Sequence, residues 1–209
     1  MAHPIKPQSY LQIDNFYTST IYNKGAEVIR MMQTIVGRDT FIKGVKHYLT
    51  KHDGEAATTD DFVRAIEKVS KRDLSQFRSW YSQAGTPNVV VKSHYNHQDK
   101  TFKLSLEQSC RPTAEKKNKE PYIIPLICTM YDDENRLISS KLIGKGEECK
   151  RNIIHLSQKK SDYIFEGIKS QPTFSLLSDF TAPVNLHYEY ERNEILRLIK
   201  HDINPFNRY

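Results

Sequence analysis

The chain has 209 residues, of which 38% are hydrophobic and 11% aromatic, so it carries enough apolar material for a packed core, which excludes wholesale disorder. Its formal net charge is +6, from 31 basic and 25 acidic side chains, and these charges are spread along the chain without a basic tract of the kind that binds nucleic acid. No stretch approaches the roughly 20 apolar residues of a membrane span, so we expect neither nucleic acid nor a membrane as a partner.

The first 87 residues show the apolar period of helices. One helix is predicted to run from Tyr22 to a stop at Gly37, with apolar positions mostly three or four residues apart. A second is predicted to begin near Asp39 and to stop before His52. Its apolar stripe contains Phe41, Ile42, Val45, Tyr48 and Leu49.

Two more helices are predicted before a boundary at Gly85-Thr86-Pro87. The hydroxyl of Thr59 is expected to cap a third helix, because it can accept from a backbone N–H of the first turn. Asp73 and Gln76 have the spacing of a capping box and open a fourth helix. The inward residues are Phe62, Val63, Ile66 and Val69 on the third helix, and Leu74, Phe77, Trp80 and Tyr81 on the fourth.

After Pro87 the apolar period changes to two, which is typical of half-buried strands. Predicted strands lie at 89–91, 102–106, 122–130, 137–143, 152–156, 163–165 and 184–188. The segment 111–121, rich in Lys, Glu and Pro, is interpreted as a solvated hairpin loop. The pattern predicts an α+β chain: a helical part at 1–87, an antiparallel β-sandwich at 88–186 and a terminal helix in 187–209.

The terminal helix carries an apolar stripe that nothing later in the chain covers. The stripe contains Ile195, Leu196, Leu198 and Ile199. Because exposed apolar surface normally has a partner, we expect a truncated protein whose covering domain lies elsewhere.

Three cysteines stand at 110, 128 and 149. Their odd number and the absence of Cys-x-x-Cys spacing argue against a disulfide framework. A reducing cytoplasm is therefore the expected location.

No catalytic or metal-binding motif emerges from the residues alone. A hydrolytic zinc needs about three protein ligands, and the helical His-Glu-x-x-His that supplies two of them is missing. His47 and His52 are five residues apart across a helix end. His94 and His97 fall in a polar turn, where a metal site remains the minor alternative to a surface turn. We expect no metal and no cofactor to be bound by this chain.

Several stretches resemble the zinc aminopeptidase N family of bacteria, in the part that follows its zinc motif. The matching stretches are Asn15-Phe16-Tyr17, Tyr22 to Met31, His52-Asp53-Gly54, Ala57 to Phe62, Trp80 to Pro87 and Phe180 to Val184. The resemblance is most specific over residues 1–87. It implies that 1–87 is the back half of a thermolysin-like catalytic domain, 88–186 the β-sandwich domain and 187–209 the start of a C-terminal helical domain.

The resemblance also implies a function and one catalytic residue. Members of the family use zinc to remove N-terminal residues from peptides, and Tyr22 matches the tyrosine whose phenol stabilises the oxyanion of the transition state. Asn23 stands where many members have glutamate. The zinc ligands and the general-base glutamate match nothing here, so we expect the chain alone to be inactive, with zinc present only in a full-length parent.

Two alternatives stay open. Tyr22 could be a helix-start tyrosine that packs at an interface. The whole chain could be a non-catalytic binding or scaffold module that docks onto a separately encoded catalytic half. Trp80 and Tyr81 are assigned to packing, because large aromatics at a helix end usually belong to a core.

Overall fold

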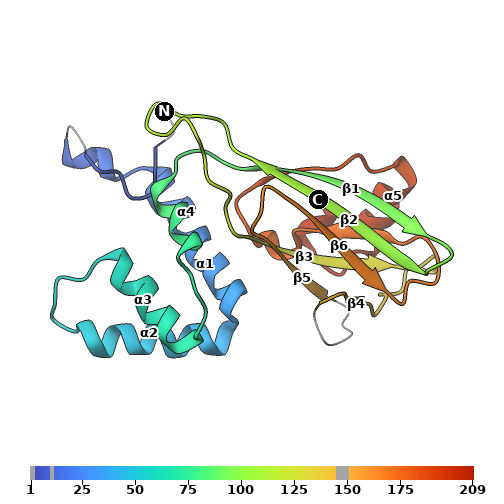
Figure 1. Cartoon of the computed structure of the whole chain (residues 1–209), viewed down its shortest axis with the longest axis horizontal. Helices are drawn as coiled ribbons and strands as arrows, with labels where there is room; N and C mark the ends of the chain where they lie inside the picture. The colour runs from blue at the N-terminus through green and yellow to red at the C-terminus, as the bar shows by residue number, and fades with distance from the viewer. Residues whose placement is uncertain (1–2, 10–11, 145–150) are drawn as a thin grey trace. The chain divides into compact units, whose positions relative to one another are not determined.

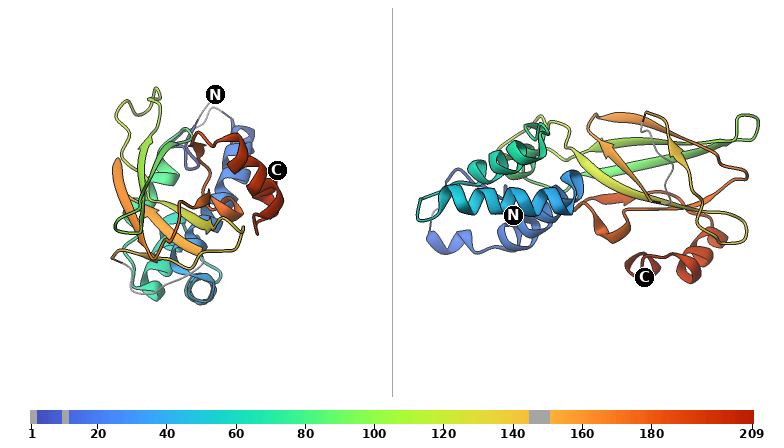
Figure 2. Two further views of the ribbon diagram at one scale, coloured as in Figure 1. Left: turned by 90° about the vertical axis from the view of Figure 1, so that its right-hand side faces the viewer. Right: turned by 90° about the horizontal axis from the view of Figure 1, so that it is seen from below.

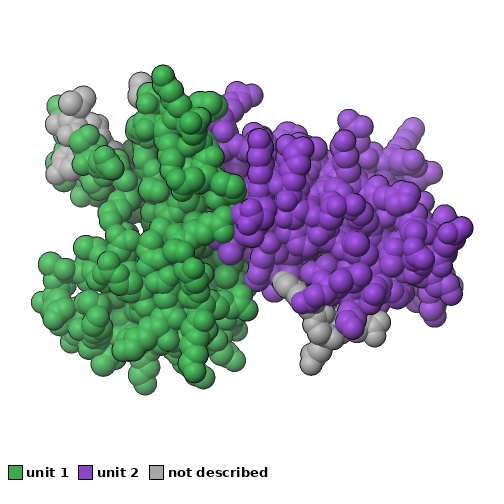
Figure 3. All heavy atoms as spheres, viewed as in Figure 1, with its two compact units in different colours: residues 1–85, 112–122 green, residues 86–111, 123–209 purple. Residues whose placement is uncertain are grey.

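The structure is a computed structural model that describes residues 3–9, 12–144 and 151–209. The chain forms two compact units (Figure 3). Unit 1 contains residues 1–85 and 112–122, and unit 2 contains residues 86–111 and 123–209. Cys149, one of the three cysteines considered above, lies outside the described residues.

Unit 1 is helical (Figure 1). Its elements are η1 (Ile13–Phe16), η2 (Thr20–Lys24), α1 (Gly25–Val36), α2 (Arg38–His52), α3 (Thr59–Ser70), η3 (Gln76–Arg78) and α4 (Ser79–Ser82). The predicted stop of the first helix is confirmed, since α1 ends at Gly37, whose φ of 85° suits a residue without a side chain. A π turn, η2, precedes α1 where the pattern predicted ordinary helix.

Helices α2 and α3 pack closely, and the contact depends on a glycine. A Cβ atom added to Gly44 would lie 2.5 Å from Ile66 Cδ1 and 3.2 Å from Ile66 Cα. The ring of Phe62 also meets Phe41 and Tyr48 of α2, with centroids 6.2 and 5.2 Å apart. The predicted α2 stripe is only partly buried.

Two members of that stripe, Ile42 and Leu49, are 53% and 60% exposed. The predicted stripe was therefore too broad. The face of α2 that meets α3 is centred on Gly44, which periodicity of large apolar residues cannot detect.

The cap of α3 is Thr58, and the prediction of Thr59 was wrong by one residue. Thr58 has extended backbone, and its hydroxyl accepts from the Asp61 N–H at 3.3 Å. The Asp61 carboxylate accepts from the Thr58 N–H at 2.9 Å, which completes a capping box. Thr59 is already the first helical residue.

The predicted capping box at Asp73 does not form. Asp73 accepts instead from the N–H of Ser75 at 2.8 Å, and the chain enters the short helices η3 and α4 in place of one longer helix. The four residues predicted to face inward do so: Leu74, Phe77, Trp80 and Tyr81 are all buried.

Segment 111–121 has no buried residue, as predicted for a solvated loop, but it is not a hairpin. It joins strands of two different sheets, and residues 112–122 belong to unit 1. The buried amide of Gln83 accepts from the Glu120 N–H at 2.9 Å and donates to the Glu120 carbonyl at 3.2 Å. The Tyr122 ring packs against Trp80, with centroids 4.4 Å apart and planes tilted by 44°. The Gln83 amide thus pairs both backbone groups of Glu120, which composition alone could not show.

Unit 2 contains two sheets and the C-terminal helix (Figure 1). Its strands are β1 (Asn88–Asn96), β2 (Thr101–Ser109), β3 (Ile124–Tyr131), β4 (Lys141–Leu142), β5 (Arg151–Leu156), β6 (Lys160–Glu166), β7 (Thr173–Leu176) and β8 (Asn185–His187). The sheet orders are β4-β6-β2-β1-β8 and β5-β3-β7. All pairs are antiparallel except β1 with β8.

The core of unit 2 lies between the two sheets. Strand β2 buries every second residue, including Phe102, Leu104 and Leu106, as predicted. Phe102 meets Phe174 of β7, with ring centroids 5.3 Å apart, so side chains of the two sheets interdigitate. The predicted α+β class with a β-sandwich is confirmed.

Two strand predictions need correction. Of segment 137–143 only Lys141–Leu142 is a strand, because the chain first bridges back to Tyr131 through Leu137 and then pairs with β6 of the other sheet. Strand β7 was not predicted. All four of its residues are buried, so its short sequence lacks the alternation that marks a half-exposed strand.

The C-terminal segment packs on unit 2 through polar contacts. It contains α5 (Arg192–His201) and η5 (Phe206–Arg208), and it is the red segment of Figure 2. The buried Tyr131 hydroxyl donates to Asp202 Oδ1 at 3.0 Å and accepts from the Ile203 N–H at 2.9 Å. On α5 itself Ile195, Leu196 and Ile199 are 45–49% exposed.

Candidate functional site

Tyr22 lies in the π turn η2, which runs directly into α1. Its N–H donates to the Thr18 carbonyl at 3.0 Å, and the Gly25 N–H donates to the Tyr22 carbonyl. A π turn bonds residues five apart and is rare, and such turns occur frequently at functional sites. No residue of this turn is buried.

The Tyr22 side chain is on the surface of unit 1. It is 59% exposed, and its ring stacks on Tyr17 with centroids 6.2 Å apart and planes 19° apart. Tyr17 is 68% exposed. Tyr17 directly follows η1, and Tyr22 lies in η2, so two phenols are presented side by side. A phenol hydroxyl can donate a hydrogen bond to a carbonyl oxygen.

Both ends of the π turn are tied to other parts of unit 1. Before it, the Thr18 hydroxyl contacts His3 Nε2 at 2.9 Å and accepts from the Ile21 N–H at 3.3 Å. At its end, Lys24 Nζ donates to the Gly85 carbonyl at 2.7 Å. The sequence pattern did not predict these two contacts, because nothing in residue spacing joins His3 to Thr18 or Lys24 to Gly85.

Trp80 and Tyr81 belong to the core, as predicted. Trp80 is fully buried and Tyr81 is 8% exposed. Burial raises the pKa of Tyr81 to about 12, and the charge of Asp60 adds to this effect. Tyr81 is therefore a packing residue whose phenol stays protonated at neutral pH.

The described residues contain no group of three or more His, Cys, Asp or Glu side chains placed to hold a metal ion. His52 Nδ1 lies 3.1 Å from Glu55 Oε2, and the His97 ring packs on Tyr95 with centroids 4.6 Å apart. A hydrolytic zinc needs about three ligands and an open position. The donors present in residues 3–9, 12–144 and 151–209 do not fit such a zinc ion.

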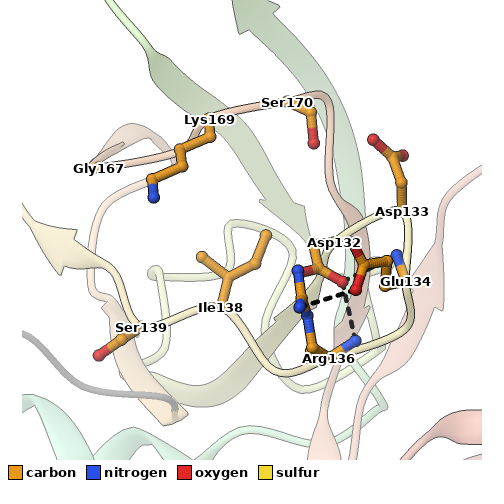
Figure 4. A pocket seen from close by; sticks show the side chains of 9 residues that line it. All are labelled: Asp132, Asp133, Glu134, Arg136, Ile138, Ser139, Gly167, Lys169 and Ser170. Atoms are coloured by element: carbon orange, nitrogen blue, oxygen red, sulfur yellow. Dashed lines mark hydrogen bonds and ion pairs between the residues drawn. The ribbon is translucent and has the colours of Figure 1, made fainter.

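Unit 2 has a surface pocket of about 400 Å³ beside the turn that follows β3 (Figure 4). Asp132 and Glu134 face it, but Arg136 lies 2.9 Å from the Asp132 carboxylate and 2.7 Å from that of Glu134. A hydrogen bond from the Arg136 backbone lowers the pKa of Asp132; burial partly offsets this, and the Arg136 side chain adds to the lowering. Asp132 therefore stays ionised and fixes the turn, which does not suit acid–base catalysis.

Comparisons with known proteins match both parts of the chain. Residues 1–81 match the peptidase family M1 domain, and residues 85–189 match DUF3458, a domain of unknown function with an Ig-like fold. Aminopeptidase N of Escherichia coli strain K12 is 41% identical and aminopeptidase N of Haemophilus influenzae is 40% identical, both over all 209 residues. The chain spans 24% of the length of each.

A solved structure supports the same relationship. Legionella pneumophila aminopeptidase A, crystallised in complex with aspartic acid, superposes with a TM-score of 0.87 and 28% identity. The match covers 99% of this chain and 22% of that one. Separately, no helix among the described residues is long and apolar enough to cross a bilayer.

The resemblance to the aminopeptidase N family that the sequence shows in Tyr22 to Met31 and in Trp80 to Pro87 is thus confirmed. It extends over all 209 residues. The Ig-like match agrees with the two packed sheets of unit 2. This chain belongs to peptidase family M1.

Proposed function

We propose that this chain is part of a zinc-dependent aminopeptidase that removes N-terminal residues from peptides, and that Tyr22 is its contribution to catalysis. The observation that carries the proposal is an exposed phenol on a π turn, at the position that matches the catalytic tyrosine of the family. As the scissile carbonyl oxygen gains negative charge, the Tyr22 O–H donates a hydrogen bond to it. Such a donor acts on the transition state more than on the substrate.

The chain by itself is proposed to be inactive. Its described residues do not fit a zinc ion, and its sequence has no His-Glu-x-x-His motif. The metal ligands and the general base would come from polypeptide other than this chain. Residues 187–209 are proposed as the start of a further helical domain, and the cytoplasm as the location, both as predicted from sequence.

A chimera tests the role of Tyr22. In E. coli aminopeptidase N, the aligned segment would be replaced by these 209 residues, since 41% identity over the whole segment favours a folded product. Hydrolysis of an aminoacyl-4-nitroanilide is then measured for the chimera and its Tyr22→Phe variant. Loss of the hydroxyl should lower kcat about 100-fold or more and change KM by less than about 3-fold.

Tyr17→Phe is the matched control, because Tyr17 stacks on Tyr22 and is likewise more than half exposed to solvent. Its kcat should stay within about 2-fold of the parent chimera. A Tyr22→Phe variant as active as the control would refute the proposed role. An inactive but folded chimera would favour the alternative of a scaffold module that docks onto a catalytic half.

A further inference from the structure

The turn that carries Tyr22 is held on one side by a chain of directional hydrogen bonds. His3 Nδ1 lies 2.8 Å from the Pro4 carbonyl, which can only accept, so Nδ1 is the donor. In neutral imidazole Nε2 is then an acceptor, and the Thr18 hydroxyl donates to it across 2.9 Å. The Thr18 oxygen in turn accepts from the Ile21 N–H at 3.3 Å. With His3 in this tautomer, each hydrogen bond from Pro4 to Ile21 has a defined donor and acceptor.

The segment that holds His3 is itself anchored. The Lys6 N–H donates to the Tyr81 carbonyl at 2.9 Å, and Lys6 Nζ pairs with Asp60 at 2.9 Å. Ile5 is 9% exposed and packs beside the start of α1, where a Cβ added to Gly25 would lie 3.8 Å from Ile5 Cγ2. The hydrogen bonds from His3 thus start from a fixed part of unit 1.

The other end of the turn is held by Lys24. Its Nζ donates to the Gly85 carbonyl at 2.7 Å and lies 5.8 Å from the centroid of the buried Trp80 ring. A cation over an indole face adds a favourable electrostatic contact. The aliphatic stem of Lys24 therefore links the end of the π turn to the end of α4.

These contacts are important because the Tyr22 side chain is not buried in the core of unit 1. Its side chain is 59% exposed, the Tyr17 ring on which it stacks is 68% exposed, and no residue of η2 is buried, so packing alone does not fix the phenol. A hydroxyl that serves a transition state must be held to within a fraction of an ångström, and a misplacement of about 1 Å can cost about 100-fold in rate. The backbone of the turn has to supply that precision.

We propose that Thr18 and Lys24 are positioning residues that hold the π turn and thereby aim the Tyr22 phenol. The inference rests on the proposed function of Tyr22. It assigns a purpose to the His3–Thr18 contact and to the Lys24–Gly85 contact, which join distant parts of the sequence around one exposed side chain.

Amide hydrogen exchange of the whole 209-residue chain tests the turn directly. Thr18→Val removes the hydroxyl at constant volume, and Lys24→Met keeps the stem without the donor. Each should speed exchange of the Tyr22 amide about 10-fold, while Thr18→Ser should stay within about 3-fold. The Met32 amide, in the middle of α1, should not change in any variant and reports that the fold is intact.

Thr34→Val is the matched control. Thr34 lies on α1 and its hydroxyl contacts the Arg30 carbonyl at 3.3 Å, so this variant removes a helical threonine hydroxyl away from the turn. It should leave Tyr22 exchange unchanged. Equal exchange in Thr18→Val and Thr34→Val would overturn the proposal.

The chimera tests whether Thr18 affects catalysis by positioning Tyr22 or only stabilises the fold. Thr18→Val should lower kcat about 10-fold with little change in KM, and should have no further effect once Tyr22 is Phe. An equal loss in both backgrounds would show that Thr18 does not act through Tyr22 and would overturn the proposal. A silent Tyr22→Phe variant would instead contradict the proposed function, and with it the catalytic purpose of the turn, even if exchange responds as expected.

Discussion

Glu67 is the acidic side chain that organises the C-terminal end of α3. Its Oε1 accepts from Arg78 Nη1 and from the Leu74 N–H, both at 2.9 Å, and its Oε2 accepts from Arg78 Nη2 at 2.7 Å. The two side chains are only 23% and 28% exposed. A two-pronged guanidinium–carboxylate contact of this kind combines charge with geometric specificity.

This geometry predicts how stability depends on pH. The hydrogen bonds from Arg78, partly offset by burial, lower the pKa of Glu67 below the usual value of 4.5 for a glutamate. A lowered folded-state pKa means that the stabilisation is complete above the unfolded pKa and is lost as the pH falls through the folded one. Glu67→Gln should therefore cost about 1–2 kcal/mol in free energy of unfolding at pH 7.

At pH values well below 4.5, Glu67→Gln and the parent should have nearly the same free energy of unfolding. Urea unfolding followed by the fluorescence of Trp80, the single and buried tryptophan, measures both values. Glu67→Asp is the control, because it keeps the charge while it shortens the reach. A pH-independent difference between Glu67→Gln and the parent would show that the charge of Glu67 is not what stabilises unit 1.

For single residues, the type of side chain that fills a role was easier to predict than the exact position of that side chain in the sequence. A threonine cap for α3 was expected, but Thr58 and Thr59 are both threonines, and only backbone geometry decides that Thr58 is extended. Tyr22 was singled out by the family resemblance. Its π turn could not be predicted, because the contacts of Thr18 with His3 and of Lys24 with Gly85 are tertiary.

Helices α2 and α3 depend on Gly44 for their close approach. Alanine normally stabilises a helix interior by about 0.5–1 kcal/mol relative to glycine. At Gly44, however, the new methyl would meet Ile66 at 2.5 Å, and Ile66 is fully buried and has little room to move. Gly44→Ala should therefore lower the free energy of unfolding by about 1–2 kcal/mol.

Gly25→Ala is the matched control within the same unit. Gly25 is also helical and buried, but an added Cβ would lie 3.8 Å from Ile5, an ordinary contact distance. That variant should be as stable as the parent or up to about 1 kcal/mol more stable. Equal effects of the two substitutions in Trp80-monitored unfolding would refute the packing argument.

At the scale of elements, the sequence pattern predicted the longer strands, including the almost fully buried β3, but it missed a four-residue strand without alternation. Strand β2 alternates and was predicted, whereas β7 is buried throughout and was missed. Segment 137–143 has strand-like composition, but it changes sheets after Leu137. Sheet membership is decided by pairing across long sequence separations, which a local pattern does not contain.

At the scale of the whole molecule, exposed apolar side chains gather at the C-terminal end. They are Ile195, Leu196, Ile199, Ile203 and Phe206, each at least 45% exposed. Exposed apolar side chains concentrated in one short segment favour association in water. The purified chain should therefore self-associate, with a sedimentation coefficient that rises with protein concentration.

Ile199→Lys should weaken that association without lowering the melting temperature, because the side chain is 49% exposed. Ile42→Lys is the control, since Ile42 is 53% exposed but lies on α2, outside this group. A parent chain that stays monomeric at all concentrations would contradict the expectation.

The broad organisation was predictable at this scale, because the change of apolar period at Pro87 separates helices from strands. What could not be predicted is that residues 112–122 belong to unit 1. Their composition favours solvent, but Gln76, Gln83 and Ala84 form hydrogen bonds with them, and the ring of Trp80 packs against Tyr122. Those partners lie about 40 residues away in the chain, far beyond any local pattern.

We propose that Tyr22 supplies an oxyanion donor, while the described residues of the chain hold no metal site. Steady-state hydrolysis of an aminoacyl-4-nitroanilide by the purified chain with added zinc, beside the chimera under identical conditions, tests both parts of this proposal. The chain alone should give no turnover above the blank, and the chimera should give turnover that a chelator abolishes. Chelator-sensitive turnover by the isolated chain would refute the proposal.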